Sequence, residues 1–248
     1  MNWFFLAIAV LCFVSRPAAA SWEEARAFAH QGDWKSAAAM YQNALANHPL
    51  EPSLHYNLGV CHDHANDPGR AVLSYERALR LSPRASDARR NLTLLREKHT
   101  LPEVRTLPPG LPAFTAWFSV EEWKWCSFSA ALWMVAACWW AALRSSHKQG
   151  TVPLCLAILG FFLMTGSALI VRARAIEERS TVVTAADVSL LLSPFSSAEI
   201  ITACPPGSIL KIEATQGSFV YAEMLPRQTK GWLPAHAIEK ISELVSPP

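Results

Sequence analysis

The chain has 248 residues, of which 51% are apolar and only 17% carry a charge, and its formal net charge is +2. A soluble domain usually contains more charge than this, and the apolar excess is concentrated in three blocks, near residues 3–14, 125–143 and 152–171. The small net charge and the absence of a Lys/Arg run exclude a nucleic-acid-binding class. The composition therefore favours a membrane-associated protein assembled from several modules.

Residues 1–20 are typical of an export signal. An apolar run from Trp3 to Val14 is followed by Ala18-Ala19-Ala20, a small-residue cleavage site, and the run is too short to span a bilayer comfortably. We predict cleavage after Ala20. An uncleaved anchor is the alternative, because no Lys or Arg precedes the apolar run.

Residues 21–100 repeat with a period of 34 residues. The equivalent pairs are Ala37 and Ala71, Tyr41 and Tyr75, Ala44 and Ala78, Leu45 and Leu79, and Pro49 and Pro83. This period, together with Asn57-Leu58-Gly59, resembles the tetratricopeptide repeat family, an all-α solenoid. We predict helices at 22–31, 34–47, 53–65, 68–81 and 86–98. The last helix has no partner helix after it, so we expect it to cap the array with a more polar face.

The resemblance to tetratricopeptide repeats implies a concave groove that binds an extended peptide or a partner helix. The groove positions fall on Trp22, Arg26, His30, Tyr56, Asn57, Val60, Asp63, His64 and Arg90. For each of these the alternative is an ordinary solvated surface residue. The carboxylate clamp of some relatives is not predicted, because too few basic residues accompany Asn57.

Two apolar stretches after a proline-rich spacer predict a transmembrane hairpin. Residues 101–116 contain four prolines and are expected to form a semi-extended linker. Residues 125–143 and 152–171 are each long enough to cross the hydrocarbon core, and a short loop joins them. Gly160 and Gly166 could aid helix packing. Neither span contains Asp, Glu, Lys or Arg, which argues against an ion pathway.

Two observations on membrane orientation disagree. The export signal places the repeats outside the cytoplasm, and Arg144 and Lys148 in the short loop then fit the cytoplasmic side. Three arginines, Arg172, Arg174 and Arg179, flank the second span on the opposite side. We give more weight to the export signal. The expected protein is a two-pass bacterial inner-membrane protein with both soluble modules in the periplasm.

Residues 180–242 predict a small all-β domain. Short β-prone runs at 181–183, 188–192, 209–212, 219–224 and 231–233 are separated by turn residues. Their order, with Gly231-Trp232-Leu233 near the end, resembles a bacterial SH3-like barrel. The resemblance implies binding of protein or peptidoglycan through an aromatic strip of Phe219, Tyr221 and Trp232. The alternative is that at least two of these side chains form the core, because a domain this small has little other core material.

Neither catalytic chemistry nor metal binding is predicted. The sequence contains no recognised catalytic or phosphate-binding motif, and its six cysteines include no CxxC pair. His62-Asp63-His64 suggests a metal site, but residues two apart on a helix point to different faces. His55 and His62 share a face without a third ligand. We expect a non-enzymatic protein with no cofactor and no metal.

The order of modules resembles the BatE-type proteins of the Bacteroides aerotolerance (Bat) cluster. This resemblance covers the whole chain in architecture and implies a membrane-anchored scaffold for protein–protein interactions. Its candidate partners are periplasmic or membrane proteins, among them the von Willebrand A-domain Bat proteins, in a process linked to aerotolerance or envelope stress. The alternative function is a peptidoglycan-binding cell-wall tether that uses the SH3-like domain.

Overall fold

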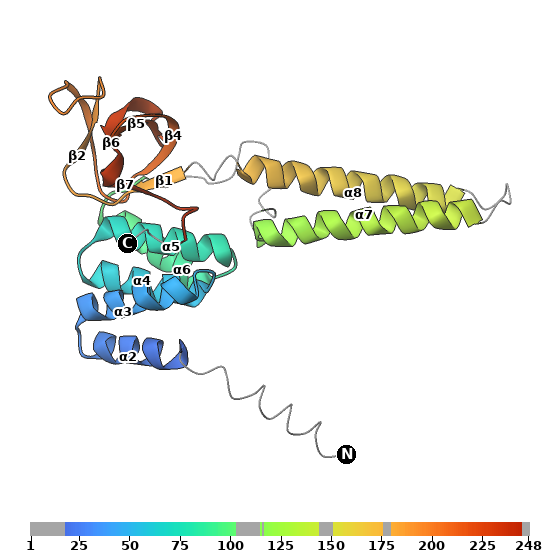
Figure 1. Cartoon of the computed structure of the whole chain (residues 1–248), viewed down its shortest axis with the longest axis horizontal. Helices are drawn as coiled ribbons and strands as arrows, with labels where there is room; N and C mark the ends of the chain where they lie inside the picture. The colour runs from blue at the N-terminus through green and yellow to red at the C-terminus, as the bar shows by residue number, and fades with distance from the viewer. Residues whose placement is uncertain (1–17, 103–114, 116, 144–150, 176–179, 245–248) are drawn as a thin grey trace, which may run out of the picture. The chain divides into compact units, whose positions relative to one another are not determined.

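The structure is a computed structural model that describes residues 18–102, 115, 117–143, 151–175 and 180–244 (Figure 1). The chain divides into two compact units. The first unit combines the residues up to 104 with the residues from 180 onward, and the second unit contains residues 105–179. Most of the predicted export signal, most of the proline-rich linker and the loop at 144–150 lie outside the described residues.

The helical part of the first unit contains five helices, α2 (Ala18–His30), α3 (Trp34–Asn47), α4 (Pro52–His64), α5 (Pro68–Leu81) and α6 (Ser86–Lys98). Their bounds agree closely with the predicted ranges, although α2 begins earlier, at Ala18. Asp33 and Asp67 cap α3 and α5 by accepting hydrogen bonds from the backbone N–H groups of Ser36 and Arg70. The two turns within the repeats therefore supply the caps of α3 and α5, whereas α6 has no side-chain cap.

The Leu-Gly pair of the repeat has a packing reason. A Cβ atom added to Gly59 of α4 would lie 2.7 Å from Cδ1 of Tyr75 on α5. Glycine is therefore required for the buried tyrosine ring to lie directly against the helix backbone. The same 34-residue spacing places Tyr41, which is also buried, in the first repeat.

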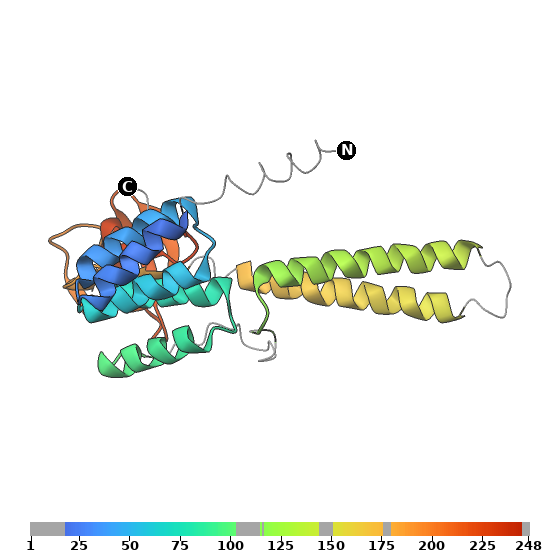
Figure 2. The same ribbon diagram turned by 90° about the horizontal axis from the view of Figure 1, so that it is seen from below.

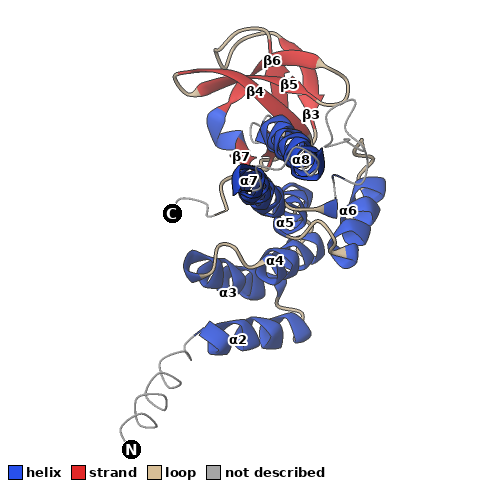
Figure 3. Cartoon of the chain, turned by 90° about the vertical axis from the view of Figure 1, so that its right-hand side faces the viewer, coloured by secondary structure: helices blue, strands red, loops and turns tan. Residues whose placement is uncertain are grey.

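The C-terminal part of the first unit is one antiparallel sheet, which we call the sheet domain (Figure 3). Its strands are β1 (Ser180–Val183), β2 (Val188–Leu191), β3 (Ile200–Cys204), β4 (Ile209–Gln216), β5 (Phe219–Met224), β6 (Thr229–Pro234) and β7 (Ile238–Lys240). Their order in the sheet is β3-β2-β6-β5-β4-β1-β7. A short 3-10 helix, η3 (Ala235–Ala237), precedes β7. The core side chains include Val183, Leu190, Leu210, Ala222 and Leu233.

The predicted all-β character is confirmed, with three corrections to the elements. Strand β4 continues to Gln216, beyond the predicted 209–212, because Ala214, Thr215 and Gln216 pair with β5. Strand β3 was not predicted from the sequence, because its short Ile200-Ile201 run follows a loop rich in serine. Strand β6 begins at Thr229, within a segment predicted to be a turn, because Thr229 and Lys230 pair with Met224 and Glu223 of β5. The finer assignment to an SH3-like barrel stays a prediction.

The sheet domain packs directly on the helical repeats within the first unit. One buried cluster contains Val72, Leu92 and Leu101 from the helical side and Val182, Ile209 and Ile241 from the sheet side. The expectation that α6 ends the array with a polar face is therefore wrong in part. Its side chains Ala88, Leu92 and Leu95 are buried in the cluster that the sheet domain shares. The sheet domain caps the array where a further repeat helix is missing.

The second unit is a hairpin of two long helices, α7 (Val120–Leu143) and α8 (Thr151–Ala175), which lie side by side (Figure 2). Small residues line the contact, because Ala130, Ala137, Gly160 and Ser167 are buried. The hydroxyl oxygens of Ser127 and Ser167 are 2.6 Å apart across the two helices. Gly160 packs against Met134 and Ala130, whereas Gly166 has no such neighbour.

One segment in the described part of the chain, Cys155–Arg172 of α8, is long and apolar enough to cross a membrane. Helix α7 is not such a segment over its described residues. Its first turns carry Glu121, Glu122 and Lys124, which precede the predicted span. The hairpin itself is thus observed. A second membrane crossing is not confirmed and stays a prediction.

Candidate partner-binding surfaces

The first surface is the face formed by the first helices of the repeats, α2, α4 and α6, which we call the first-helix face. On it, the amide Nδ2 of Asn91 donates to the Tyr56 hydroxyl at 3.3 Å, and Lys98 Nζ lies 3.1 Å from the Asp63 carboxylate. Both pairs join α4 to α6, and both join residues 35 positions apart. The structure therefore brings two predicted groove residues, Tyr56 and Asp63, beside α6.

The Tyr56 pair continues into the core. The Tyr56 ring lies 6.1 Å from the ring of Tyr75, and burial raises the pKa of the Tyr75 hydroxyl. That hydroxyl also interacts with Asn91. Because the network holds Tyr56 and Asn91 in fixed positions, the polar atoms of this face are ordered before any partner arrives.

Two neighbouring residues of α6 remain exposed on this face. Leu94 is 52% exposed, and the Arg90 side chain makes no hydrogen bond or ion pair with the described residues. Leu94 was not among the predicted groove residues. It stands 34 residues after Val60, so the repeat period places it at the equivalent position. Leu94 and Arg90 together offer one apolar side chain and one unpaired cation, one helical turn apart on α6.

The other predicted groove residues have different environments. The ring of His64 stacks on Trp34 of α3, at 4.0 Å with an angle of 10° between the planes, so packing between helices already engages it. Trp22 packs against the core of the first repeat and lies 6.4 Å from the ring of His48. Arg26 is exposed and pairs with Glu23 at 3.2 Å. Asn57 is half-buried.

The second surface is the outer face of the sheet domain. Along β5, buried residues alternate with half-buried ones, and Phe219 and Tyr221 belong to the half-buried set. Trp232 of β6 is also half-buried, and its ring lies 5.2 Å from that of Tyr221. The core is built instead from Val220, Ala222, Met224 and similar side chains. The alternative that at least two of the three aromatic residues form the core is therefore wrong.

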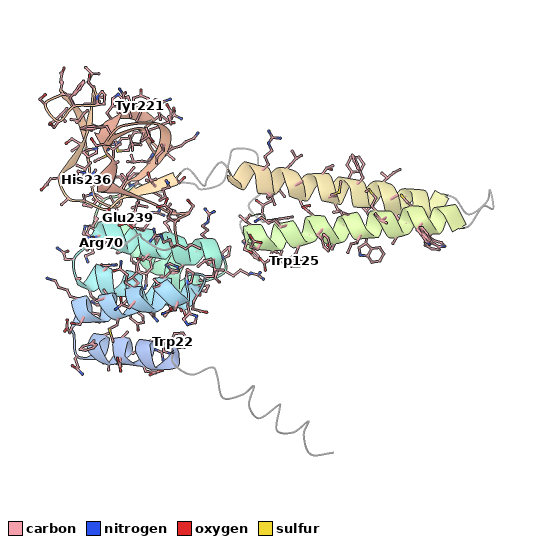
Figure 4. The ribbon with its side chains drawn as sticks, viewed as in Figure 1. Trp22, Arg70, Trp125, Tyr221, His236 and Glu239 are labelled. Atoms are coloured by element: carbon pink, nitrogen blue, oxygen red, sulfur yellow. The ribbon has the colours of Figure 1, made fainter. Side chains whose placement is uncertain are left out.

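The aromatic residues belong to a longer row that crosses five strands. Strand register pairs Ile200 with Leu191, Leu191 with Trp232, Trp232 with Tyr221, and Tyr221 with Ala214. Directly paired residues lie on the same face of a sheet. We call these five residues the apolar row. Figure 4 shows Tyr221 on the sheet domain at a distance from Glu239 and Arg70, which lie where the repeats meet the sheet.

The junction between repeats and sheet contains a buried arginine. Arg77 of α5, whose side chain is 7% exposed, donates to the Lys240 carbonyl at 3.0 Å and lies 3.6 Å from the Glu239 carboxylate. Its neighbour Glu76 pairs in the other direction with Arg96 of α6. Buried charges are costly unless paired, so these contacts fix how α5 is oriented between α6 and the sheet domain.

The histidines of α4 do not form a metal site in the described part of the chain, where no group of three His, Cys, Asp or Glu side chains could hold an ion. His55 is fully buried, and its Nε2 lies 2.9 Å from the Pro49 carbonyl oxygen. Burial lowers the pKa of His55, so the neutral ring is favoured. The cysteines Cys61 and Cys204 are buried, and burial raises the pKa of each thiol to about 11.

Comparison with known families supports the helical part of this description. Residues 22–86 match the family described as tetratricopeptide repeat. The matched segment contains α3, α4 and α5, and the match agrees with the 34-residue period. Among curated proteins no match is found. Tetratricopeptide repeats are modules for protein–protein interaction, so the match indicates a protein-binding role for this part of the chain.

Proposed function

We propose that the protein is a non-enzymatic, membrane-anchored scaffold whose first-helix face binds a protein partner outside the cytoplasm. The observation that carries this proposal is the composition of the α4–α6 surface. Ordered polar atoms of Tyr56 and Asn91 stand beside the exposed side chains of Leu94 and Arg90. The tetratricopeptide repeat match over residues 22–86 supports the same class of function.

This surface suits an extended peptide that carries a carboxylate and an apolar side chain. The Arg90 guanidinium can pair with the carboxylate in bidentate geometry, since no described residue engages it. Leu94 supplies apolar area nearby, and the Asn91 and Tyr56 groups can hydrogen-bond the peptide backbone. An acidic residue flanked by an aliphatic residue is therefore the expected recognition element of the partner.

The hairpin supports membrane anchoring, because its small side chains face the helix contact and its large apolar side chains face outward. Small residues fill the helix contact, while large apolar side chains such as Trp133 and Phe162 are 70% and 66% exposed. In water this arrangement would be unfavourable. In lipid it is expected, because close backbone packing rather than burial of large side chains brings membrane helices together.

The contact between the repeats and the sheet domain supports an even number of crossings. The repeats precede the hairpin, the sheet domain follows it, and the two share one buried cluster. Modules in contact lie on the same side of a membrane. If α8 crosses the membrane once, a second crossing between residues 104 and 180 is required, and α7 is the helix that can supply it. This agrees with the predicted two-pass topology.

The partner class in this proposal comes from the resemblance to BatE-type proteins. Their neighbours are von Willebrand A-domain membrane proteins, and we propose a partner of this type at the bacterial inner membrane. The predicted export signal places both soluble modules on the periplasmic side. A peptidoglycan tether is the alternative function for the sheet domain, and it would use the aromatic residues of the apolar row.

The proposal is tested by a pull-down of tagged full-length protein from gently solubilised membranes. A variant with Arg90→Ala and Leu94→Ala removes the exposed groups of α6 without changing its buried side chains. Lys35→Ala, an exposed position on α3, is the matched control. We expect a von Willebrand A-domain membrane protein with the wild type and the control, and its loss with the double variant. Equal recovery by all three proteins would refute the assignment of the first-helix face.

A further inference from the structure

We propose that the outer face of the sheet domain rests on the lipid surface of the membrane, through the apolar row and the adjoining tip of the β2–β3 hairpin. We call the apolar row together with Leu192 and Phe195 the apolar patch. The inference deepens the proposed function, because it requires α8 to be anchored in a membrane. It adds a second membrane contact that no apolar helix provides.

The patch is apolar, but it is not equally exposed along its length, because Leu191 is only 8% exposed. Leu192, Phe195 and Ile200 are each more than 60% exposed, and the half-buried rings of Trp232 and Tyr221 continue the surface across β6 and β5. At about 4.8 Å per strand, a row across five strands extends over roughly 20 Å. An exposed apolar surface of this extent on a soluble domain marks an interaction site.

Most charged side chains near the patch lie beside it, but exposed Glu199 lies within its tip, where its carbonyl oxygen accepts a hydrogen bond from the Leu192 N–H. Glu223 and Lys230 form the next pair along β5 and β6, and Lys230 Nζ lies 2.6 Å from the Glu213 carboxylate. Glu199 is the one charged residue between Val188 and Cys204. An apolar surface that carries Trp and Tyr rings and has a charged margin is the composition that favours a membrane interface.

The short tether between α8 and β1 favours lipid as the occupant. Helix α8 extends to Ala175, and β1 begins at Ser180, so the two ends are separated by at most about 18 Å of chain. Ser180 pairs with Lys211 of β4. The β4 end of the apolar row, Ala214, is three residues further along that strand, or about 10 Å. The linker therefore keeps Ser180 within about 18 Å of the last residue of α8, and one end of the apolar row lies about 10 Å along β4 from the residue that pairs with Ser180.

The test is the depth of nitroxide spin labels on the full-length protein in lipid nanodiscs. The hairpin cysteines Cys126, Cys138 and Cys155 are first replaced by alanine, and Cys61 and Cys204 are buried. Labels are then placed singly by Ile200→Cys and Phe195→Cys in the patch. Arg227→Cys is the control, exposed in the turn before β6, and Leu163→Cys reports on the hairpin. Power saturation compares collisions with oxygen, which partitions into lipid, and with a water-soluble nickel chelate.

We expect the labels at 195, 200 and 163 to favour oxygen and the label at 227 to favour nickel. If 163 favours oxygen but 195 and 200 resemble 227, the lipid contact is wrong while the anchoring of the hairpin stands. If 163 also resembles 227, the membrane anchoring in the proposed function fails as well. Protection of 195 and 200 from both reagents would identify a protein contact. Protection that requires added peptidoglycan sacculi would identify a cell-wall contact. Either result would overturn the proposal.

Discussion

Replacement of Gly69 by alanine should force the sheet domain away from the repeats. A Cβ atom at this position of α5 would lie 2.7 Å from the Val183 carbonyl oxygen and 2.9 Å from the Thr184 Cα. Both atoms belong to the backbone, so neither can move without displacing the end of β1. Gly69 is also buried in the first turn of α5. The new methyl group therefore has no alternative position.

The sign of the effect distinguishes the packed structure from a free repeat array. In an isolated helix, alanine is favoured over glycine by up to about 1 kcal/mol. Overpacking costs about 1–3 kcal/mol, and the upper part of that range, about 2–3 kcal/mol, applies here because both neighbouring atoms belong to the backbone. After the helix-propensity gain is subtracted, a net loss of about 1–2 kcal/mol is expected. For a protein of this size, each 1 kcal/mol lowers the melting temperature by about 2–4 °C. The variant should therefore melt several degrees below the wild type.

The assay combines thermal unfolding with amide hydrogen exchange on the full-length protein in nanodiscs. The N–H of Val183, which donates to the Ser208 carbonyl at 3.0 Å, should exchange faster in Gly69→Ala. Asn43→Ala is the control, because Asn43 is exposed on α3 and its replacement gains helix propensity without a new contact. An unchanged or raised melting temperature for Gly69→Ala, with unchanged exchange at β1, would refute the packing of the sheet domain on α5.

Three further predictions concern the core, the hairpin and pH. Leu233→Ala should cost about 2–5 kcal/mol in the free energy of unfolding, because Leu233 is fully buried. Trp232→Ala should cost less than half as much, despite the larger side chain. Equal costs measured by chemical unfolding would contradict the assignment of Leu233 to the core and of Trp232 to the outer face of β6. Gly160→Leu should slow disulfide formation between cysteines placed by Ser127→Cys and Ser167→Cys, because a side chain there meets Met134 and Ala130. An unchanged rate would argue against this helix contact. Burial lowers the pKa of His55 and of His62 below 6.5, the value in the unfolded chain. The unfolded chain therefore binds protons more readily, so the free energy of unfolding should be highest above pH 6.5 and should decrease as the pH drops below that value. A His55→Gln variant should show a smaller fall in melting temperature between pH 7.5 and 5, and an identical fall would mean that His55 does not contribute.

The helical part of the fold could be predicted from the repeat period, because residues close in sequence set where each helix begins and ends. The capping aspartates Asp33 and Asp67 and the prolines Pro49 and Pro83 recur at the fixed spacing of 34 residues, so the helix limits could be predicted from the sequence. The same period could have identified Leu94, since it stands one repeat after Val60. Strand β3 was missed because its two isoleucines are too few to distinguish a strand from a loop.

The junction between repeats and sheet could not be predicted, because it depends on residues far apart in the chain. Arg77 and Lys240 are separated by 163 positions, and Arg77 by itself looks like an ordinary surface residue of a helix. Gly69 likewise resembles a turn glycine until the backbone of β1 is placed beside it. The sequence also left open whether Phe219, Tyr221 and Trp232 point into the core or lie on the outer face of the sheet. Their register with Leu191 and Ala214 places them on the outer face.

The measurement that tests the central claim most directly is the side of the membrane on which each module lies. The protein without the hairpin cysteines Cys126, Cys138 and Cys155 is the background, and single cysteines are introduced by Thr93→Cys in the repeats, Arg227→Cys in the sheet domain and Ser146→Cys between α7 and α8. Intact spheroplasts that contain each variant are then treated with a membrane-impermeant maleimide. The account predicts labelling at 93 and 227 in intact spheroplasts, and at 146 only after lysis. Labelling of 93 and 227 from opposite sides would contradict it, because the two modules could then not share one core.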